Sequence, residues 1–514
     1  MRHPFPRRPS PWPAVLLALL LLAPSAPRAE AQVEVGPNDF RISFVEGTGN
    51  PDFDAFDPAV AFNPIANEFL VVWQALHAPA ACGPGFTGEL EIFAQRVDAA
   101  TGALLGAPVT VSDAGPPCDG RFEPADPAVD FNPGDEEYLV VWSGDDSLGG
   151  LVDNEMEIFG QRITAAGAET GANDFRISDM GGTGNPAFRA TDPGVAFDFN
   201  KGHYLVVWRG DDDVGSLIDN EFEIFGQRIT TAGAETGAND FRISDMGDDG
   251  STDYEADHPA VVYSTLSAEW LVVWDSDDNE GGVINGEREI FGQRIDPFGA
   301  EVDDNDFRIS QQGGSGDGTI DAANPDVALD TDTARYLVVW EGNPTDGVSI
   351  AREIFGQVLD SGGGEVGADF RISDLGGNSP DPIAFNARLP AAAYDSVDGE
   401  FLVAWSGDDN ERGQVAGEGE VYVQRLDRLG MELGANDFRI SDMGGIGNTP
   451  FDGGIADLAA AAPANRFLAV WRGDDDVGGL ADNEFEIFGQ LLVMPLFADG
   501  FESGDTSEWT QTAP

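Results

Sequence analysis

The sequence predicts an all-β fold, a seven-bladed β-propeller with four strands in each blade, from a repeat that runs through most of the 514 residues. A strand-like segment that ends in tryptophan, such as YLVVW, occurs seven times. A second segment, such as EIFGQR, follows each tryptophan, and its glutamines are 66, 66, 66, 64, 67 and 66 residues apart. The tryptophans are Trp73, Trp142, Trp208, Trp274, Trp340, Trp405 and Trp471, and the glutamines are Gln95, Gln161, Gln227, Gln293, Gln357, Gln424 and Gln490. So regular a period indicates one supersecondary unit copied seven times.

Each unit contains four segments with the composition of strands. The first resembles Asp192–Phe197, the second is the segment that ends in tryptophan, the third is EIFGQR, and the fourth is NDFRIS, as at Asn173–Ser178. All four are rich in Val, Ile and Phe and are bounded by Gly, Asp, Asn or Pro, which is typical of strands. No segment has a sustained helical period, so the predicted fold is all-β.

The second and third segments predict how the sheets pack. The second is apolar at consecutive positions, which indicates a strand buried on both faces between neighbouring sheets. Its tryptophans are therefore expected in the core. The third carries a glycine (Gly160, Gly226, Gly292) where a missing side chain would let a neighbouring sheet approach closely.

The two ends of the repeat favour a closed ring over a linear solenoid, which is the competing architecture. A lone fourth-type segment, Asn38–Ser43, precedes the first unit. The last unit ends with a third-type segment at Glu484–Val493 and has no fourth. Pairing these two segments removes two exposed sheet edges that a solenoid would have to cover. The prediction is a ring closed three strands plus one.

The YLVVW, IFGQR and FRIS segments resemble the repeats of exported bacterial β-propeller proteins, most of which have no assigned activity. The resemblance covers residues 38–493. It implies the propeller architecture and offers no catalytic residues to transfer. The segment Phe497–Trp509, DGFESGDTSEW in its core, resembles a tail found at the ends of exported bacterial proteins. This tail implies a sorting signal or the remnant of a further domain.

Residues 1–31 have the pattern of a secretory signal peptide. Three arginines precede the apolar run Ala14–Ala23, and Ala29-Glu30-Ala31 fits a cleavage site. Arg7-Arg8 leaves twin-arginine export open as a less favoured route. We therefore expect a signal peptide at 1–31, the propeller at 32–493 and a tail at 494–514. The expected location is secreted or cell surface, without a transmembrane segment.

The chain is strongly acidic. After residues 1–31 are removed, 23 basic and 91 acidic residues give a net charge of −68, and Lys201 is the only lysine. Such a surface repels nucleic acid, whose affinity for proteins comes largely from Lys and Arg. The excess carboxylates fit either a hydrated, soluble surface or the binding of divalent cations, and composition alone does not separate these.

The acidic residues concentrate on one face of the predicted ring. This face holds the loops between second and third strands and the loops between blades, and the opposite face has short glycine-containing turns. The predicted metal-ligating residues, with Ca²⁺ as the ion, are Asp145, Asp146, Asp153, Asp211, Asp212, Asp213, Asp219, Asp474, Asp475, Asp476 and Asp482. No segment matches a complete EF-hand loop, although residues 275–279 come nearest. Turn formation by Asp, Asn and Gly is the competing interpretation.

Cys82 and Cys118 are the only cysteines, and in an exported protein they predict a disulfide. The histidines do not recur with the repeat, which argues against a catalytic cysteine. The arginine of each fourth strand is expected to pair with neighbouring carboxylates.

The sequence leads to two functional hypotheses. The first is a non-enzymatic scaffold that binds an unknown protein or glycan on its acidic rim, with calcium. The alternative is an extracellular polysaccharide hydrolase or lyase that uses carboxylates of the same rim. Known sialidase and quinone-enzyme motifs are missing from the sequence, and no catalytic residue is predicted.

Overall fold

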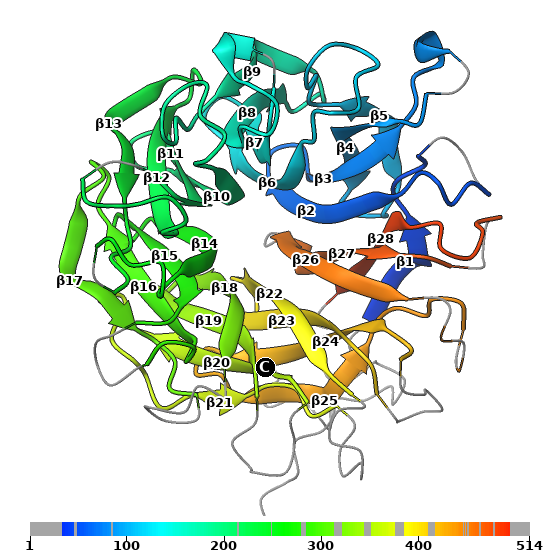
Figure 1. The fold of residues 1–514 in the computed structure, drawn as a ribbon. Coiled ribbons are helices and arrows are strands. Elements are labelled where there is room, and N and C mark those ends of the chain that lie inside the picture. The colour runs from blue at the N-terminus through cyan, green and yellow to red at the C-terminus, as the bar shows by residue number, and fades with distance from the viewer. Residues whose placement is uncertain are drawn as a thin grey trace, which may run out of the picture.

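The computed structural model forms a ring of seven four-stranded antiparallel sheets (Figure 1). It describes residues 33–45, 49–83, 86–146, 148–212, 215–247, 249–278, 284–312, 321–343, 351–375, 385–409, 417–445, 447, 449, 452–461, 464–475 and 479–493. The predicted signal peptide and tail lie outside these residues. Within these ranges the helical segments are two short 3₁₀ turns, η1 (Ala80–Cys82) and η2 (Leu148–Gly150), and no helix is long and apolar enough to span a membrane. The all-β, seven-bladed prediction is confirmed.

The strands are numbered along the chain, and each blade takes four of them. Blades 1 and 2 comprise β2 (Ala55–Asn63), β3 (Glu68–His77), β4 (Glu89–Asp98), β5 (Leu104–Thr110), β6 (Ala125–Asn132), β7 (Glu137–Gly144), β8 (Glu157–Thr164) and β9 (Glu169–Arg176). Blades 3 and 4 comprise β10 (Ala190–Asp198), β11 (His203–Gly210), β12 (Glu223–Thr230), β13 (Glu235–Arg242), β14 (Ala256–Ser264), β15 (Glu269–Ser276), β16 (Glu289–Ile295) and β17 (Glu301–Arg308). Blades 5 and 6 comprise β18 (Ala322–Asp330), β19 (Arg335–Gly342), β20 (Glu353–Leu359), β21 (Phe370–Arg371), β22 (Ala387–Asp395), β23 (Glu400–Gly407), β24 (Glu420–Asp427) and β25 (Glu432–Arg439). Blade 7 comprises β26 (Gly453–Ala461), β27 (Arg466–Gly473), β28 (Glu486–Val493) and β1 (Val33–Arg41).

In blade 7 the two ends of the repeat meet. β1 pairs antiparallel with β28, and Phe40 lies opposite Gly489. The outer strand of the last blade therefore comes from the N-terminal part of the chain, and blade 7 has four strands like the others (Figure 1). This pairing gives β28 its outer neighbour, and β1 becomes the edge strand of blade 7, as β5 is in blade 1.

The core lies between the blades, where the second strands pack. Trp208 is buried completely, as are the valines that precede it in β11. One apolar cluster combines Leu205 and Val207 of blade 3 with Val272 and Trp274 of blade 4, and similar clusters recur around the ring. Burial on both faces explains the unbroken apolar run of these strands.

The third-strand glycine makes room within its own blade. A Cβ on Gly226 would lie 2.8 Å from Cδ1 of Ile243, which follows the outer strand of the same blade. The expectation that this glycine admits a neighbouring sheet was therefore wrong. It admits the side chains that fold over it from the outer strand, with Phe241 at 3.2 Å.

The periodic glutamine joins the third and fourth strands across a bulge. Gln161 Oε1 accepts the backbone N–H of Asp174 at 3.0 Å, and its Nε2 donates to the carbonyls of Arg162 and Thr170. Asp174 has a φ of 41°, and its Oδ2 accepts the N–H of Asp113 from blade 1 at 2.8 Å. The fourth strand begins before the bulge, at Glu169, which is four residues earlier than predicted. One buried amide thus holds a blade together, and the aspartate beside it joins that blade to its neighbour.

Candidate functional site

The described members of the predicted metal-ligating set lie on one face, but in the structure the first aspartate of each Asp-Asp pair holds loops together. Asp211 is buried, and its two carboxylate oxygens accept the N–H groups of Arg189 at 2.7 Å and Asn220 at 2.9 Å. Asp145 and Asp474 make the same two contacts in their blades. Each carboxylate therefore joins an inter-blade loop to a loop between second and third strands.

The second aspartate of each pair also binds backbone. Asp146, Asp212 and Asp475 accept N–H groups from Gly115, Gly181 and Gly444, each at 3.1 Å. The fourth-strand arginines behave as predicted, since Arg176 pairs with Asp179 at 3.0 Å. Many carboxylates of this face therefore pair with arginines or accept backbone N–H groups that would otherwise have no acceptor. Buried polar groups need such hydrogen-bond partners.

The other predicted ligands do not join them in a cluster. Asp153, Asp219 and Asp482 are exposed, and Asp213 and Asp476 lie outside the described residues. Within the described part of the chain, no three His, Cys, Asp or Glu residues are grouped as metal ligands. Calcium binding stays a prediction, which a melting curve with and without chelator would test.

Replacing Asp211 by alanine should reduce the free energy of unfolding by about 2 kcal/mol, because two N–H groups lose their acceptor. The matched variant is Asp219→Ala, which removes an exposed carboxylate of the same loop and should stay within about 0.5 kcal/mol of the parent. Denaturant unfolding measures both. Equal destabilisation of the two variants, with a loss of stability in chelator, would instead indicate a shared metal ion.

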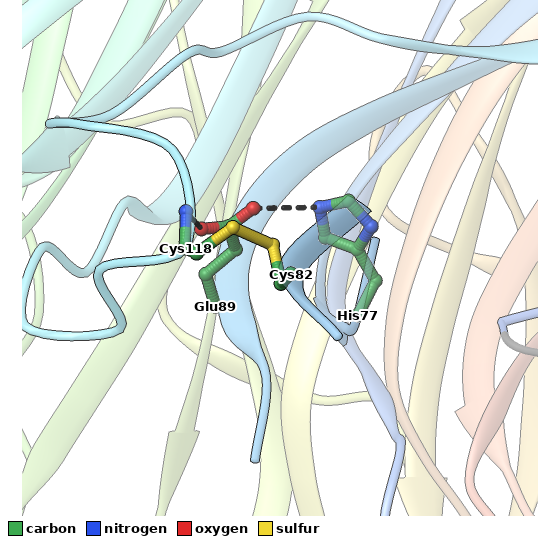
Figure 2. Close-up of a disulfide and its surroundings, with 4 residues drawn as sticks. All are labelled: His77, Cys82, Glu89 and Cys118. Atoms are coloured by element: carbon green, nitrogen blue, oxygen red, sulfur yellow. Dashed lines mark hydrogen bonds and ion pairs between the residues drawn. A yellow bond between two sulfur atoms is a disulfide. The ribbon is translucent and has the colours of Figure 1, made fainter. Parts of the chain in front are cut away.

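A disulfide joins Cys82 to Cys118, with 5.4 Å between their Cα atoms (Figure 2). Cys82 lies in the loop between β3 and β4, and Cys118 lies in the loop that leads to blade 2. Beside the bridge, Glu89 accepts the N–H of Cys118 at 2.9 Å and approaches Nε2 of His77 at 3.8 Å (Figure 2). The bridge fixes the inserted loop of blade 1 to the inter-blade loop.

A different group of residues surrounds the axis of the ring on this acidic face. Here the innermost strands line a cavity of about 290 Å³, which we call the axial pocket. Its wall consists mainly of the residue before the strand's proline in six blades: Asp57, Asp126, Asp192, His258, Asn324 and Leu389. All six have φ between 46° and 53°. Each innermost strand carries a bulge at this point, as between Thr191 and Gly194, and such bulges redirect a side chain.

Three neighbouring blades place a carboxylate at this position. Each carboxylate has one oxygen bonded within its own blade: Asp57 to Gln74 Nε2 at 2.8 Å, Asp126 to Ser143 Oγ at 3.2 Å, and Asp192 to Thr191 Oγ1 at 3.0 Å. The second oxygen of each accepts no hydrogen bond from the described residues. These oxygens are therefore free to bind hydroxyl groups or water in the pocket.

Asp126 stands between Asp57 and Asp192 in the ring order. Burial raises its pKa first, the negative charges of Asp192 and Asp57 raise it further, and the result is a pKa of about 7. Burial also raises the pKa of Asp57, while Arg472 opposes that shift. The arrangement favours a proton on the middle carboxyl, because two neighbouring carboxylates disfavour its ionised form.

Blade 4 contributes an imidazole held by charged groups. His258 Nδ1 lies 2.8 Å from Asp275 Oδ1, and Arg288 donates to Asp275 and to Asp257. Burial alone would lower the pKa of His258, but the hydrogen bond to Asp275 and the nearby carboxylates raise it above 6.5. The imidazole lies in the blade that follows that of Asp192, at one end of the arc of carboxylates.

The sequence contained a signal for this pocket. When the seven copies are aligned on the proline of the first strand, which is Ala456 in the seventh copy, the preceding residue is Asp, Asp, Asp, His, Asn, Leu and Ile, whereas the neighbouring core positions repeat. The carboxylates of the outer loops, being more numerous, obscured it. Residues that vary among identical blades mark where the ring lacks sevenfold symmetry, and here they meet at one cavity.

Comparisons with known proteins give fold neighbours only. No family model and no curated protein matches the chain. Among solved structures, an ulvan lyase bound to a GlcA–Rha3S substrate is 10% identical, with a TM-score of 0.48, 89% of this chain and 95% of the lyase covered. An α-L-arabinofuranosidase of Fusarium graminearum in complex with arabinobiose is 11% identical, with a TM-score of 0.39 and coverage of 69% and 89%. A Hadza microbial sialidase is 10% identical, with a TM-score of 0.41 and coverage of 79% and 73%. These neighbours act on glycans.

Proposed function

We propose that this protein is an exported enzyme that cleaves extracellular polysaccharides in the axial pocket, and that it acts as a glycoside hydrolase. The observation that supports the proposal is the arc of Asp57, Asp126 and Asp192 at a position where the repeat is broken. A symmetric scaffold has no need to vary one position in seven copies. A single asymmetric ligand on the axis would explain that variation.

The chemistry assigned to the arc follows from the two protonation states it holds. Glycoside hydrolysis needs one protonated carboxyl and one carboxylate on either side of the bond to be cleaved. Asp126, with a pKa of about 7, is the acid that protonates the leaving oxygen. Asp57 or Asp192, each fixed by one hydrogen bond, then acts as the carboxylate that activates water or attacks the sugar.

His258 bears on the choice between hydrolase and lyase. A lyase needs a base that removes a proton next to a uronate carboxyl group, and a neutral imidazole serves as such a base. Burial lowers the pKa of His258, but the hydrogen bond to Asp275 and the nearby carboxylates raise it overall, and this direction favours the protonated imidazole, which is a poorer base. This favours hydrolysis, and the rim carboxylates then remain loop supports.

The test is a screen of the secreted protein against extracellular polysaccharides, with two product assays. Hydrolysis releases reducing ends without ultraviolet-absorbing products, and elimination releases unsaturated ends that absorb. The expected result is reducing ends alone. Unsaturated ends that absorb ultraviolet light would indicate a lyase. Binding without either product would support the non-enzymatic scaffold instead.

A further inference from the structure

The seam between blades 6 and 7 differs from the rest of the axial pocket. The residue that follows the second-strand tryptophan is Ser406 in blade 6 and Arg472 in blade 7. Blades 2 and 3 have the same two residue types there, and the other blades carry Gln, Asp or Glu. Directly before the third-strand glutamate that corresponds to Glu420, blade 6 has Gly419, whereas the other six blades carry a large side chain: Leu90, Met156, Phe222, Arg288, Arg352 and Phe485. Side chains are therefore missing along this seam.

The register of the strands places two arginines on either side of this gap. Arg388 lies opposite Ser406 in blade 6, and Gly454 lies opposite Arg472 in blade 7. A Cβ on Gly454 would lie 4.0 Å from Cβ of Ser406, with no other atom as near. The four residues thus form a continuous row from one blade to the next, with a guanidinium at each end and small residues between them.

Although Arg388 acts on Asp408 electrostatically, neither guanidinium forms an ion pair with a carboxylate within the described part of the chain. Other arginines around the pocket do: Arg209 pairs with Asp257, Arg288 with Asp257 and Asp275, and Arg352 with Glu341. Arg388 is exposed and its side chain makes no hydrogen bond to the described residues. We call Arg388, Ser406, Gly454 and Arg472 the arginine cradle.

Arg472 is held in place by aromatic rings and forms no ion pair with a carboxylate of the described residues. Its guanidinium stacks on Phe485 at 3.8 Å and on Phe56 at 4.8 Å, and its Nε is buried without an acceptor. The carboxylates of Asp54, Asp57, Asp452 and Asp474 act on it electrostatically, but none lies within ion-pair distance. Aromatic rings fix such a planar group and leave its edge open to an acceptor.

We propose that the arginine cradle binds an oxyanion, the carboxylate or sulfate group of an acidic sugar, and so selects acidic glycans for the axial pocket. Two guanidiniums supply donors for such a group, and Ser406, whose hydroxyl donates to the carbonyl of Arg388 at 3.4 Å, leaves space between them. Leu389, which follows Arg388, lines the axial pocket, and Arg472 acts electrostatically on Asp57 of the pocket wall, so the cradle borders the pocket. The sugar's anionic group then lies at blades 6 and 7, and its hydroxyls face the carboxylates of blades 1 to 3. The substrate class rests on the proposed function, but the binding site does not.

The test is calorimetric binding of three oligosaccharides of equal length to the full secreted chain. One carries carboxylates (oligogalacturonide), one sulfates (a sulfated galactan), and one is neutral (galactan). We expect at least one acidic oligosaccharide to bind about tenfold or more tightly than the neutral one. Whichever acidic probe binds identifies the oxyanion. Equal binding of all three, or binding of none, would overturn the proposal.

Three variants locate the site. Arg388→Gln and Arg472→Gln should each weaken acidic binding about tenfold and leave neutral binding unchanged. Gly454→Asp should abolish the preference, because the gap admits a carboxylate that pairs with Arg472 internally. Arg121→Gln, which removes an exposed arginine paired with Asp119 on the same face, is the control. Since Arg388 is exposed, its variant folds even if Arg472→Gln does not.

The two proposals fail separately. Tight, Arg388-dependent binding of an acidic oligosaccharide without cleavage would refute the hydrolase and leave the arginine cradle standing. Cleavage of acidic glycans with a kcat/KM that Arg388→Gln leaves unaffected, or a preference for neutral glycans, would refute the cradle and leave the hydrolase standing.

Discussion

Replacing Asp126 by asparagine is expected to lower kcat/KM by about 10²–10⁴-fold, the usual contribution of a general acid. Asparagine keeps the size of the side chain and its hydrogen bond with Ser143 but carries no transferable proton. The activity of the parent enzyme should also fall as pH rises through about 7, because Asp126 loses its proton there. In the variant, the rate should be low at every pH, and the fall in activity as pH rises through about 7 should be absent.

The measurement is the initial rate of reducing-end release against pH for the parent and two variants. Asp253→Asn removes an exposed carboxylate from an inter-blade loop of the same face and should leave the rate unchanged. A substrate with a good leaving group needs little protonation, so it should recover much of the lost rate in Asp126→Asn. If Asp126→Asn keeps the full rate, the general acid is another carboxyl of the arc and not Asp126.

The fold followed from the sequence because its determinants recur. The strand that ends in tryptophan is apolar along its whole length in every blade, because it is buried between two neighbouring sheets. The periodic glutamine was recognised by its spacing, but its role was not, because the bulge that brings Asp174 to Gln161 is set by backbone geometry. A regular spacing reveals that a contact exists without revealing which atoms make it.

The candidate site was harder to predict from the sequence, because its residues do not recur in every repeat. Sequence composition drew attention to Asp211 and its copies, and their acidity is real, but each is an acceptor for loop N–H groups. Asp57, Asp126 and Asp192 are separated by about one repeat and look unremarkable singly. They meet only because the ring closes around its axis. The arginine cradle was also hard to predict, because it depends on the small size of Gly454 and Ser406, which leaves space between the two arginines.

Thermal stability should decrease as pH rises from about 5 to about 8, because seven glutamates are buried in the folded ring. Each lies at or near the start of a third strand and accepts a hydrogen bond from the serine that follows the paired outer strand, as Glu223 does from Ser244. Burial is the main cause that raises their pKa values. The pKa is about 8 for Glu91, Glu157, Glu223 and Glu353, and about 7 for Glu289, Glu420 and Glu486.

The direction of the effect follows from which state holds the proton. In the unfolded chain a glutamate has the ordinary pKa of 4.5, so between 4.5 and about 8 the folded protein binds more protons than the unfolded one. The stabilisation is complete below 4.5 and is lost as pH rises through the folded pKa. One pKa unit corresponds to about 1.4 kcal/mol, so a single unit at each of seven sites amounts to roughly 10 kcal/mol. That is comparable with the whole stability of a typical domain.

Calorimetric melting at pH 5 and pH 8 measures the effect, and a loss of this size lowers Tm by about 10 °C for a chain of this length. General repulsion among surface carboxylates acts in the same direction but is screened by salt, whereas buried groups are screened little, so the difference should persist at high ionic strength. Glu223→Gln should keep the acceptor for the N–H of Met246 and remove the titration. Its Tm should therefore change less with pH than that of the parent. If the dependence vanishes in salt, or Glu223→Gln leaves it unaltered, the buried glutamates are not its origin and the surface charge is.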